Sequence, residues 1–157
     1  MIAALLKNET VRRRTEDLML AYYPERGVAS YKELGVRPLT ESESFYTSKL
    51  LKDGIDMVVV VRMIKYDKKK MFAQGQWPAY YNNWKDYYNF ASPTYYTPDF
   101  YAIDKLYNVE VNIYSLTNNK LIWTGITSTM NASGPDDLFD DVINIIHDYM
   151  VKEDFLK

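Results

Sequence analysis

The chain has 157 residues, with 19 Lys and Arg residues against 21 Asp and Glu residues, which is the size of one domain with its own core. The formal net charge of -2 argues against a nucleic-acid binder. The absence of cysteine beside a single histidine excludes disulfide scaffolds, thiolate metal sites, cysteine nucleophiles and multi-histidine metal sites. We therefore expect a single domain spanning residues 1–157 that uses no metal and no cofactor.

The first part of the chain predicts strands alternating with helices. Ile2 to Leu6 is an apolar strand, and Asn8 can cap a helix over residues 9–23. A short strand is expected over residues 27–31, after a glycine turn. Thr40 or Ser42 can cap a second helix over residues 42–53.

The second part begins with the strongest strand signal of the chain, residues 55–66, whose continuous β-branched centre predicts a central, doubly buried strand. Residues 106–116 and 121–130 predict an antiparallel hairpin around an Asn-rich turn. Residues 133–136 resemble a capping box and predict the start of a long amphipathic helix. The expected core is made of apolar side chains from these elements: Val58 to Val61, Val109, Val111, Ile113, Leu138, Val142, Ile145 and Ile146.

These elements together predict the α/β class, an α+β sandwich. It has a mixed sheet of about five strands with two or three helices packed on it. The C-terminal antiparallel hairpin is followed by the long amphipathic helix.

Residues 76–101 fit neither the helical nor the strand period and hold most of the aromatic excess, so we expect an insert loop there. Tyr and Trp combine an apolar ring with a polar edge, which suits a partner surface or stacking on sugar rings. Three interpretations remain open: the insert packs on its own domain, binds a protein, or binds a glycan or peptidoglycan. The candidate binding residues are Trp77, Tyr80, Tyr81, Trp84, Tyr87, Tyr88, Tyr95 and Tyr96.

The remaining polar motifs favour structural roles. Arg12 to Arg14 predict a solvated helix face with an Arg12–Glu16 pair, and the acidic cluster around Asp137 suits the positive end of a helix dipole. His147 is expected at the boundary of the core. No known catalytic motif is present. An enzyme of an unrecognised kind would need carboxylates that converge near the insert, for which the candidates are Asp86, Asp99 and Asp104.

Three stretches carry a resemblance to a known family: residues 12–17 (RRRTED), 53–60 (DGIDMVVV) and 120–129 (KLIWTGITST), followed by the final amphipathic helix. Their order resembles small bacterial cell-envelope lipoproteins grouped as a domain of unknown function, which often carry a Tyr/Gly/Pro-rich segment before the closing hairpin. The resemblance implies a mixed α/β sandwich, broadly like the amino-terminal domain of the Tol-system translocation protein and the lipoprotein activators of penicillin-binding proteins.

The same resemblance implies a non-enzymatic interaction module on the periplasmic side of the cell envelope. Its partner would be an envelope protein or a glycan, and no nucleic acid is expected. The membrane would be reached only through a lipid on a cysteine upstream of Met1. A native start at Met1 would instead place the protein in the cytoplasm.

Overall fold

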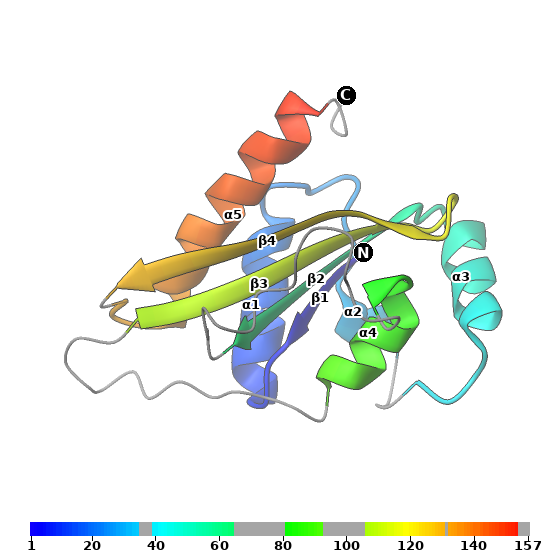
Figure 1. Cartoon of the computed structure of the whole chain (residues 1–157), viewed down its shortest axis with the longest axis horizontal. Coiled ribbons are helices and arrows are strands. Elements are labelled where there is room, and N and C mark those ends of the chain that lie inside the picture. Colours follow the sequence, from blue (N-terminus) through cyan, green and yellow to red (C-terminus); the bar gives the residue numbers. More distant parts are fainter. Residues whose placement is uncertain (35–38, 65–80, 93–105, 131, 154–157) are drawn as a thin grey trace.

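The computed structural model describes residues 1–34, 39–64, 81–92, 106–130 and 132–153, without the side chains of residues 135 and 136. The described strands form one mixed sheet in the order β1 (Ile2–Leu5), β2 (Met57–Ile64), β3 (Leu106–Ser115) and β4 (Lys120–Met130) (Figure 1). The pair β1–β2 is parallel, while β2–β3 and β3–β4 are antiparallel. The predicted hairpin is therefore confirmed, and β1 and β4 are the two edge strands.

The helices lie on both faces of the sheet (Figure 1). On one face, α1 (Glu9–Leu20) and the long α5 (Pro135–Lys152) contribute to the first core cluster. On the other face, α3 (Glu43–Lys52) and α4 (Trp84–Ala91) contribute to the second, together with Leu34, which directly follows the short α2 (Ser30–Glu33). No helix in the described ranges is long and apolar enough to cross a membrane.

The mixed α/β class is confirmed, but the element counts differ from the expectation of about five strands and two or three helices. The described residues form four strands and five helices. The strand predicted at residues 27–31 is reduced to one bridge between Ala29 and Ile2, because the chain turns into α2 at Ser30. Helix α4 lies inside the segment predicted as an insert loop.

Both faces of β2 are buried, as its continuous apolar sequence predicts. Val59 and Val61 belong to the cluster beneath α1 and α5, whereas Val58 and Val60 belong to the cluster beneath α4. The other predicted core residues are also buried, with one exception. Ile145 is 48% exposed, so its assignment to the core is wrong.

The turns and caps follow the sequence closely. Asn8 accepts the amides of Thr10 and Val11 at the start of α1. Ser42 accepts the amide of Phe45 at the start of α3. Asn119 adopts a φ of 46° in the β3–β4 turn, the left-handed conformation that asparagine tolerates. The local signals therefore place these element boundaries correctly.

Candidate functional site

The four candidate aromatic residues within the described ranges lie in the interior. Tyr81, Trp84, Tyr87 and Tyr88 all belong to the second core cluster, and the most exposed, Tyr81, is only 4% accessible. This is the arrangement expected if the insert packs on its own domain. The other four candidates, Trp77, Tyr80, Tyr95 and Tyr96, lie outside the described residues. Ligand binding by the insert stays a prediction.

A short amphipathic helix explains why these rings are buried. Asn83 caps α4, with its Oδ1 accepting the amide of Asp86 at 2.8 Å. The buried residues of the helix recur at the spacing of one helical face: Trp84, Tyr87, Tyr88 and Ala91. This spacing and the cap are the sequence signals that could have identified the helix. Asp86 is exposed and binds the Asn83 amide at 2.6 Å, while Asp99 and Asp104 lie outside the described residues.

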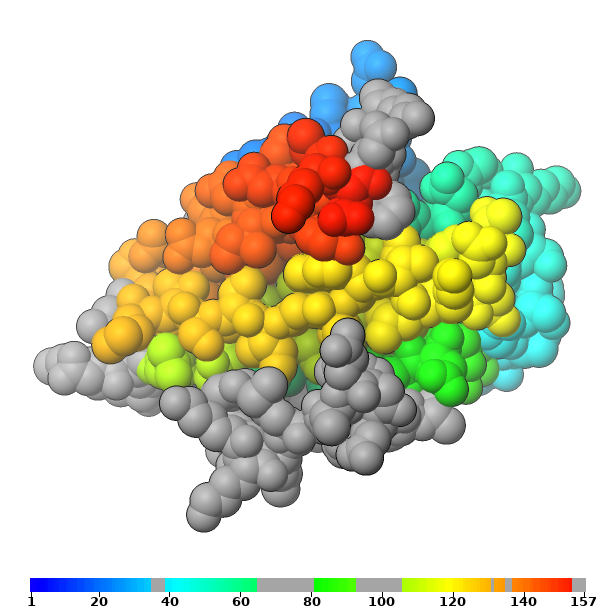
Figure 2. All heavy atoms as spheres, turned by 45° about the horizontal axis from the view of Figure 1, so that its top comes forward, coloured from blue at the N-terminus to red at the C-terminus, as the bar shows by residue number. Residues whose placement is uncertain are grey.

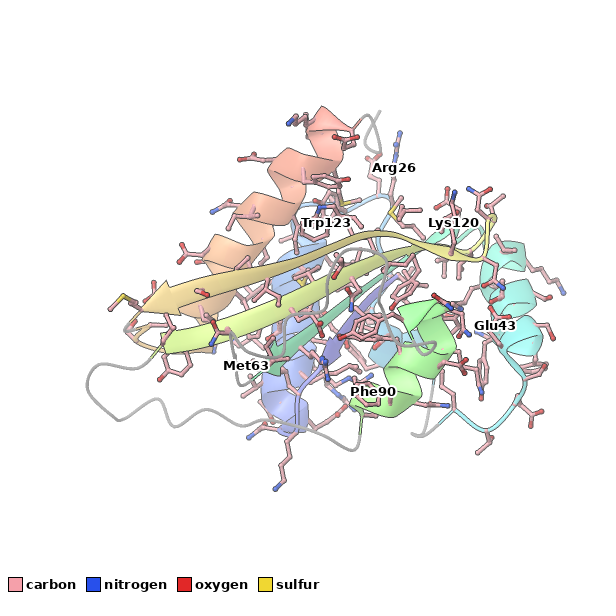
Figure 3. All side chains as sticks on the ribbon, in the orientation of Figure 1. Arg26, Glu43, Met63, Phe90, Lys120 and Trp123 are labelled. Carbon is pink, nitrogen blue, oxygen red and sulfur yellow. The ribbon has the colours of Figure 1, made fainter. Side chains whose placement is uncertain are left out.

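A carboxylate lies buried beneath α4. Glu110 of β3 accepts hydrogen bonds from Tyr81 Oη at 2.8 Å, from Arg62 Nε at 2.5 Å and from the hydroxyl of Tyr87. The Arg62 guanidinium lies 5.2 Å from the ring centroid of Tyr87 and 5.4 Å from that of Phe90 (Figure 3 shows Phe90 on α4). The cluster therefore joins α4 to the two central strands.

The surroundings of the cluster fix the protonation states of Arg62 and Tyr87. Burial alone would lower the pKa of Arg62. The interactions with Tyr87 and Glu110 raise this pKa by more than burial lowers it, so the pKa lies above its ordinary value. Burial and the negative charge of Glu110 raise the pKa of Tyr87 well above its ordinary value. Arg62 is thus charged and Tyr87 is a neutral donor at physiological pH. Both Glu110 oxygens are occupied by these protein donors, so the carboxylate acts as a structural acceptor.

Next to Glu110 on the same face of β3, two polar side chains lack partners. The amide oxygen and nitrogen of Asn112 and the hydroxyl of Tyr114 are buried and form no hydrogen bond in the part of the chain that the structure describes. Burial raises the pKa of Tyr114 above its ordinary value, and the negative charge of Glu110 raises it further. A buried unpaired amide costs free energy, so Asn112 weakens this part of the core.

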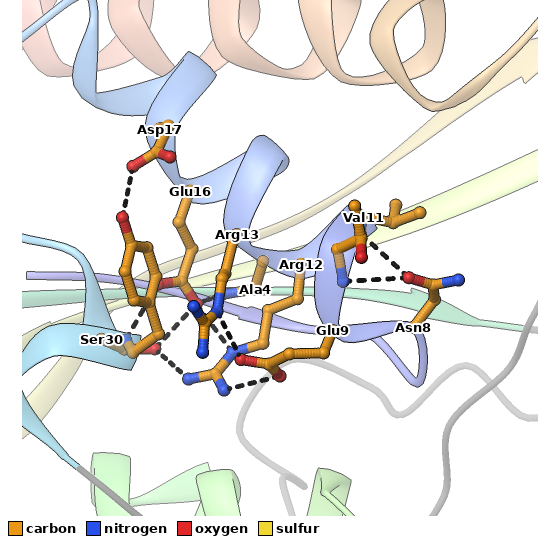
Figure 4. Close-up of polar contacts among 11 residues, drawn as sticks. Ala4, Asn8, Glu9, Val11, Arg12, Arg13, Glu16, Asp17 and Ser30 are labelled. Atoms are coloured by element: carbon orange, nitrogen blue, oxygen red, sulfur yellow. Dashed lines mark hydrogen bonds and ion pairs between the residues drawn. The ribbon is translucent and has the colours of Figure 1, made fainter.

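A second buried ion pair covers the outer edge of β1 (Figure 4). Arg12 Nε lies 3.1 Å from Glu16 Oε1, which confirms the predicted pair. The expectation of a solvated face is wrong for these two residues, because Arg12 is 4% exposed and Glu16 is fully buried. The reason is that Glu16 also accepts the Ala4 amide at 3.0 Å and the Ser30 hydroxyl at 2.7 Å. The network thus binds an outward amide of β1.

The backbone of β1 is also paired at its first residue. Ile2 donates its amide to the carbonyl of Val28 at 2.9 Å, next to the single bridge at Ala29. Both outward amides of β1, at Ile2 and Ala4, therefore have partners from the same chain. This edge of the sheet is closed to any further strand.

The opposite edge, β4, has no neighbouring strand on its outer side among the residues that the structure describes, and we call it the open edge. Val59 of β2 donates its amide to the carbonyl of Met1 at 2.9 Å, so the amide and carbonyl of Val59 point toward β1. The amide and carbonyl groups of its two neighbours in β2 therefore point toward β3. The same alternation applies to β3 and β4 through their pairing. It directs the amides of Thr124, Ile126 and Ser128 in β4 away from β3, toward the outside of the sheet. No hydrogen bond to these three amides is found among the residues that the structure describes. Figure 2 shows β4, in yellow and orange, at the surface beside α5.

Exposed apolar side chains flank this edge on both faces. Ile126 is 43% exposed on the α4 side of β4, and Met130 is exposed at the end of the strand. On the other side, residues 141 and 149 of α5 contact β4. Asp141 accepts a hydrogen bond from the Thr129 hydroxyl at 3.3 Å, and the ring centroids of Tyr149 and Trp123 are 4.8 Å apart. Ile145 lies between them on the same helix face. Its exposure follows from its position above an edge strand instead of the centre of the sheet.

A small cavity lies at one end of the first core. It has a volume of about 190 Å³. Four of its lining residues are methionines, Met1, Met19, Met57 and Met150, and its polar lining residues include Arg26 and Asp56. His147 is half-buried nearby, where its Nδ1 lies 3.4 Å from the Tyr23 hydroxyl. This agrees with its predicted boundary position. Within the described residues, no group of three or more His, Cys, Asp or Glu side chains could hold a metal ion.

In the part of the chain that the structure describes, the fold and these sites define a small mixed α/β domain with two buried ion-pair clusters and one open sheet edge. The chain matches no protein-family model and no curated protein. Among solved structures, it is similar to a PelC dodecamer from Paraburkholderia phytofirmans, at 10% identity over 88% of this chain and 74% of that chain, with a TM-score of 0.38. It is also similar to the lipoprotein GNA1162 from Neisseria meningitidis, at 9% identity over 96% of this chain and 91% of that chain, with a TM-score of 0.41. Similarity at this level carries no argument about function.

Proposed function

We propose that the protein is a non-enzymatic interaction module of the bacterial cell envelope, and that it binds a protein partner through the edge of β4. The observation that carries the proposal is the contrast between the two sheet edges. The outward amides of β1 are paired within the chain, whereas those of Thr124, Ile126 and Ser128 are unpaired among the described residues. An open edge strand accepts a strand from another chain through its backbone groups.

The sequence of β4 supports this use of the edge. Proteins usually block an exposed edge with a charge, a proline, a pronounced bulge or a very short strand. Strand β4 is 11 residues long, has no proline, and its only charged residue is Lys120 at its first position. The one irregularity in its pairing lies near that same end, opposite Ile113 and Tyr114. The long remainder, up to Met130, is regular and uncharged.

The non-enzymatic part of the proposal rests on how the buried acids are used. Glu110 and Glu16 are the two buried carboxylates of the described residues, and each accepts several hydrogen bonds from its own chain. Neither residue lines the cavity of about 190 Å³ at the end of the first core. Their chemistry is that of buried acceptors which hold helices to the sheet.

The envelope location rests on the sequence resemblance to lipoproteins. It is tested by expressing the complete gene product in its host and following its fractionation and its labelling with a radioactive fatty acid. Recovery in the membrane fraction with incorporated label is expected. A soluble, unlabelled cytoplasmic product would contradict this part of the proposal.

Binding at β4 is tested with a photo-reactive amino acid placed at Ile126 in living cells. The matched control carries the same residue at Phe45, which is 53% exposed and lies on α3, a helix of the second core that forms no part of the β4 edge. We expect one discrete adduct from position 126 and none from position 45. No adduct at position 126, or the same adducts from both positions, would refute binding through this edge.

A further inference from the structure

The side chains along the open edge of β4 indicate which partner binds there. Resting on the proposed use of β4, we propose that the strand pairs with β4 of a second copy of this chain. The two strands run antiparallel, and a twofold axis passes between the two Ile126 residues. The two four-stranded sheets then form one continuous sheet of eight strands. This arrangement is isologous, so it closes at a dimer.

The backbone geometry allows this pairing. In an antiparallel pair, residues that exchange two hydrogen bonds are those whose amide and carbonyl groups face the partner. Thr124, Ile126 and Ser128 have this orientation in β4. An axis at Ile126 pairs Ile126 with its equivalent and pairs Thr124 with Ser128 of the second copy. Every outward group in this stretch then has a partner.

The side chains are self-complementary in the same register. On the α4 side, Ile126 meets Ile126, and the hydroxyl residues Thr124 and Ser128 meet each other. Apolar pairs and Thr–Ser pairs directly opposite one another stabilise antiparallel strands. On the α5 side, Trp123 lies opposite Thr129 of the second copy. The single charged residue, Lys120, meets no like charge, so nothing in β4 opposes self-pairing.

The surface beside β4 indicates that the partner is a second copy of the chain and not a single peptide strand. Ile145 lies above β4 on α5 and is 48% exposed. A partner that brings only a strand would leave this side chain in water. A second copy also brings its own α5 on the same face of the extended sheet, next to Ile145. Ile126 and Ile145, which are exposed on opposite faces of the edge, are then both covered.

Single-cysteine crosslinking tests the pairing and its register, because the natural sequence contains no cysteine. In Ile126→Cys the two thiols flank the twofold axis, and a short bis-maleimide linker joins them. In the control Met130→Cys the residue is 70% exposed, but the two copies are eight residues apart along the strand pair. At a rise of about 3.4 Å per residue, this separation is about 27 Å, beyond the reach of the linker. We expect a covalent dimer from Ile126→Cys alone.

A sedimentation experiment on the uncrosslinked protein gives an independent readout. The unmodified chain is expected to dimerise with rising concentration. Ile126→Lys should weaken the dimer at least about tenfold, since it places two lysines at the axis. Phe45→Lys should leave the dissociation constant unchanged. Circular dichroism and urea unfolding confirm that each variant is folded.

The outcomes separate this inference from the proposed function. Equal crosslinking of Ile126→Cys and Met130→Cys, or a monomer throughout the millimolar range, overturns the symmetric dimer. If the photo-reactive residue at position 126 then yields an adduct with a different protein in cells, the edge still binds a partner and only the self-pairing is wrong. If neither experiment yields an adduct, both proposals are refuted.

Discussion

The buried cluster beneath α4 predicts a large loss of stability when Arg62 is replaced by methionine. The Arg62 and Glu110 side chains are 13% and 4% exposed, and their charged atoms are 2.5 Å apart. Methionine keeps the apolar length of the arginine side chain but removes its charge. Glu110 then remains buried with only the two tyrosine hydroxyls as donors. Breaking a buried ion pair on one side costs about 3–5 kcal/mol, and we expect this loss in the free energy of unfolding.

An exposed ion pair of the same protein provides the matched control. Lys49 Nζ lies 3.0 Å from Glu33 Oε2, but the two side chains are 41% and 26% exposed. Lys49→Met removes the same kind of charge in contact with water, where such a pair contributes about 0–1 kcal/mol. The contrast between the two variants isolates the effect of burial from that of ion-pair distance.

The assay is urea unfolding followed by tryptophan fluorescence and by circular dichroism. The double variant Arg62→Met/Glu110→Gln should cost less than the sum of its single variants, with a coupling of about 0.5–3 kcal/mol, because neither charge is then left alone. Equal losses for Arg62→Met and Lys49→Met, or strictly additive single variants, would refute the assignment of Glu110 as a buried, charge-paired acceptor.

Three further predictions concern the sheet and the first core. Asn112→Leu removes two unpaired buried atoms and should raise the free energy of unfolding by about 1–2 kcal/mol in the same assay; a loss would show that the amide is satisfied. Gly125→Ala places a Cβ 2.5 Å from Cη2 of Trp123, so the indole must shift and its contact with the Tyr149 ring must change. We expect a loss of about 1–3 kcal/mol and an altered near-ultraviolet circular dichroism spectrum; an unchanged spectrum would contradict the packing. Burial raises the pKa of Tyr23 from 10.0 to about 12. The neutral Tyr23 side chain therefore contributes to the free energy of unfolding in full below pH 10. This contribution, at most about 2–3 kcal/mol, is lost as the pH rises to about 12, because the hydroxyl ionises first in the unfolded chain. Tyr23→Phe should remove this part of the pH dependence of urea unfolding.

Local sequence patterns predicted most of the sheet because their signals depend on neighbouring residues. The β-branched run of β2, the Asn-rich turn and the caps Asn8 and Ser42 each specify their own conformation. Helix α4 was missed because its aromatic residues suggested an irregular insert, although Trp84, Tyr87, Tyr88 and Ala91 recur with helical spacing. Its cap at Asn83 was the available signal.

The polar interior could not be predicted from local patterns, because its partners are distant in the sequence. Glu110 receives hydrogen bonds from Arg62 and Tyr81, which are 48 and 29 residues away. Glu16 is buried because it binds the outward amide of a strand 12 residues earlier, at Ala4. A carboxylate on an alternating strand or a charged helix suggests a solvated position until these donors are known.

The exposure of Ile145 has a similar origin. Its place in the apolar pattern of α5 favoured the core, but the pattern does not specify how far the sheet extends beneath the helix. Residues 141, 145 and 149 lie over β4, the last strand of the sheet. The apolar pattern of the helix therefore marks a surface that the described residues leave uncovered, and we relate that surface to partner binding.

Amide hydrogen exchange along β4, resolved residue by residue by NMR, tests the open edge most directly. In dilute protein, we expect rapid exchange at Thr124, Ile126 and Ser128 and slow exchange at Trp123, Gly125 and Thr127, whose amides face β3. Raising the protein concentration should slow exchange at the first three amides and leave the others unchanged. Uniform protection along β4 in dilute solution, or outward amides that exchange equally fast at all concentrations, would contradict an edge that a second copy of the chain closes.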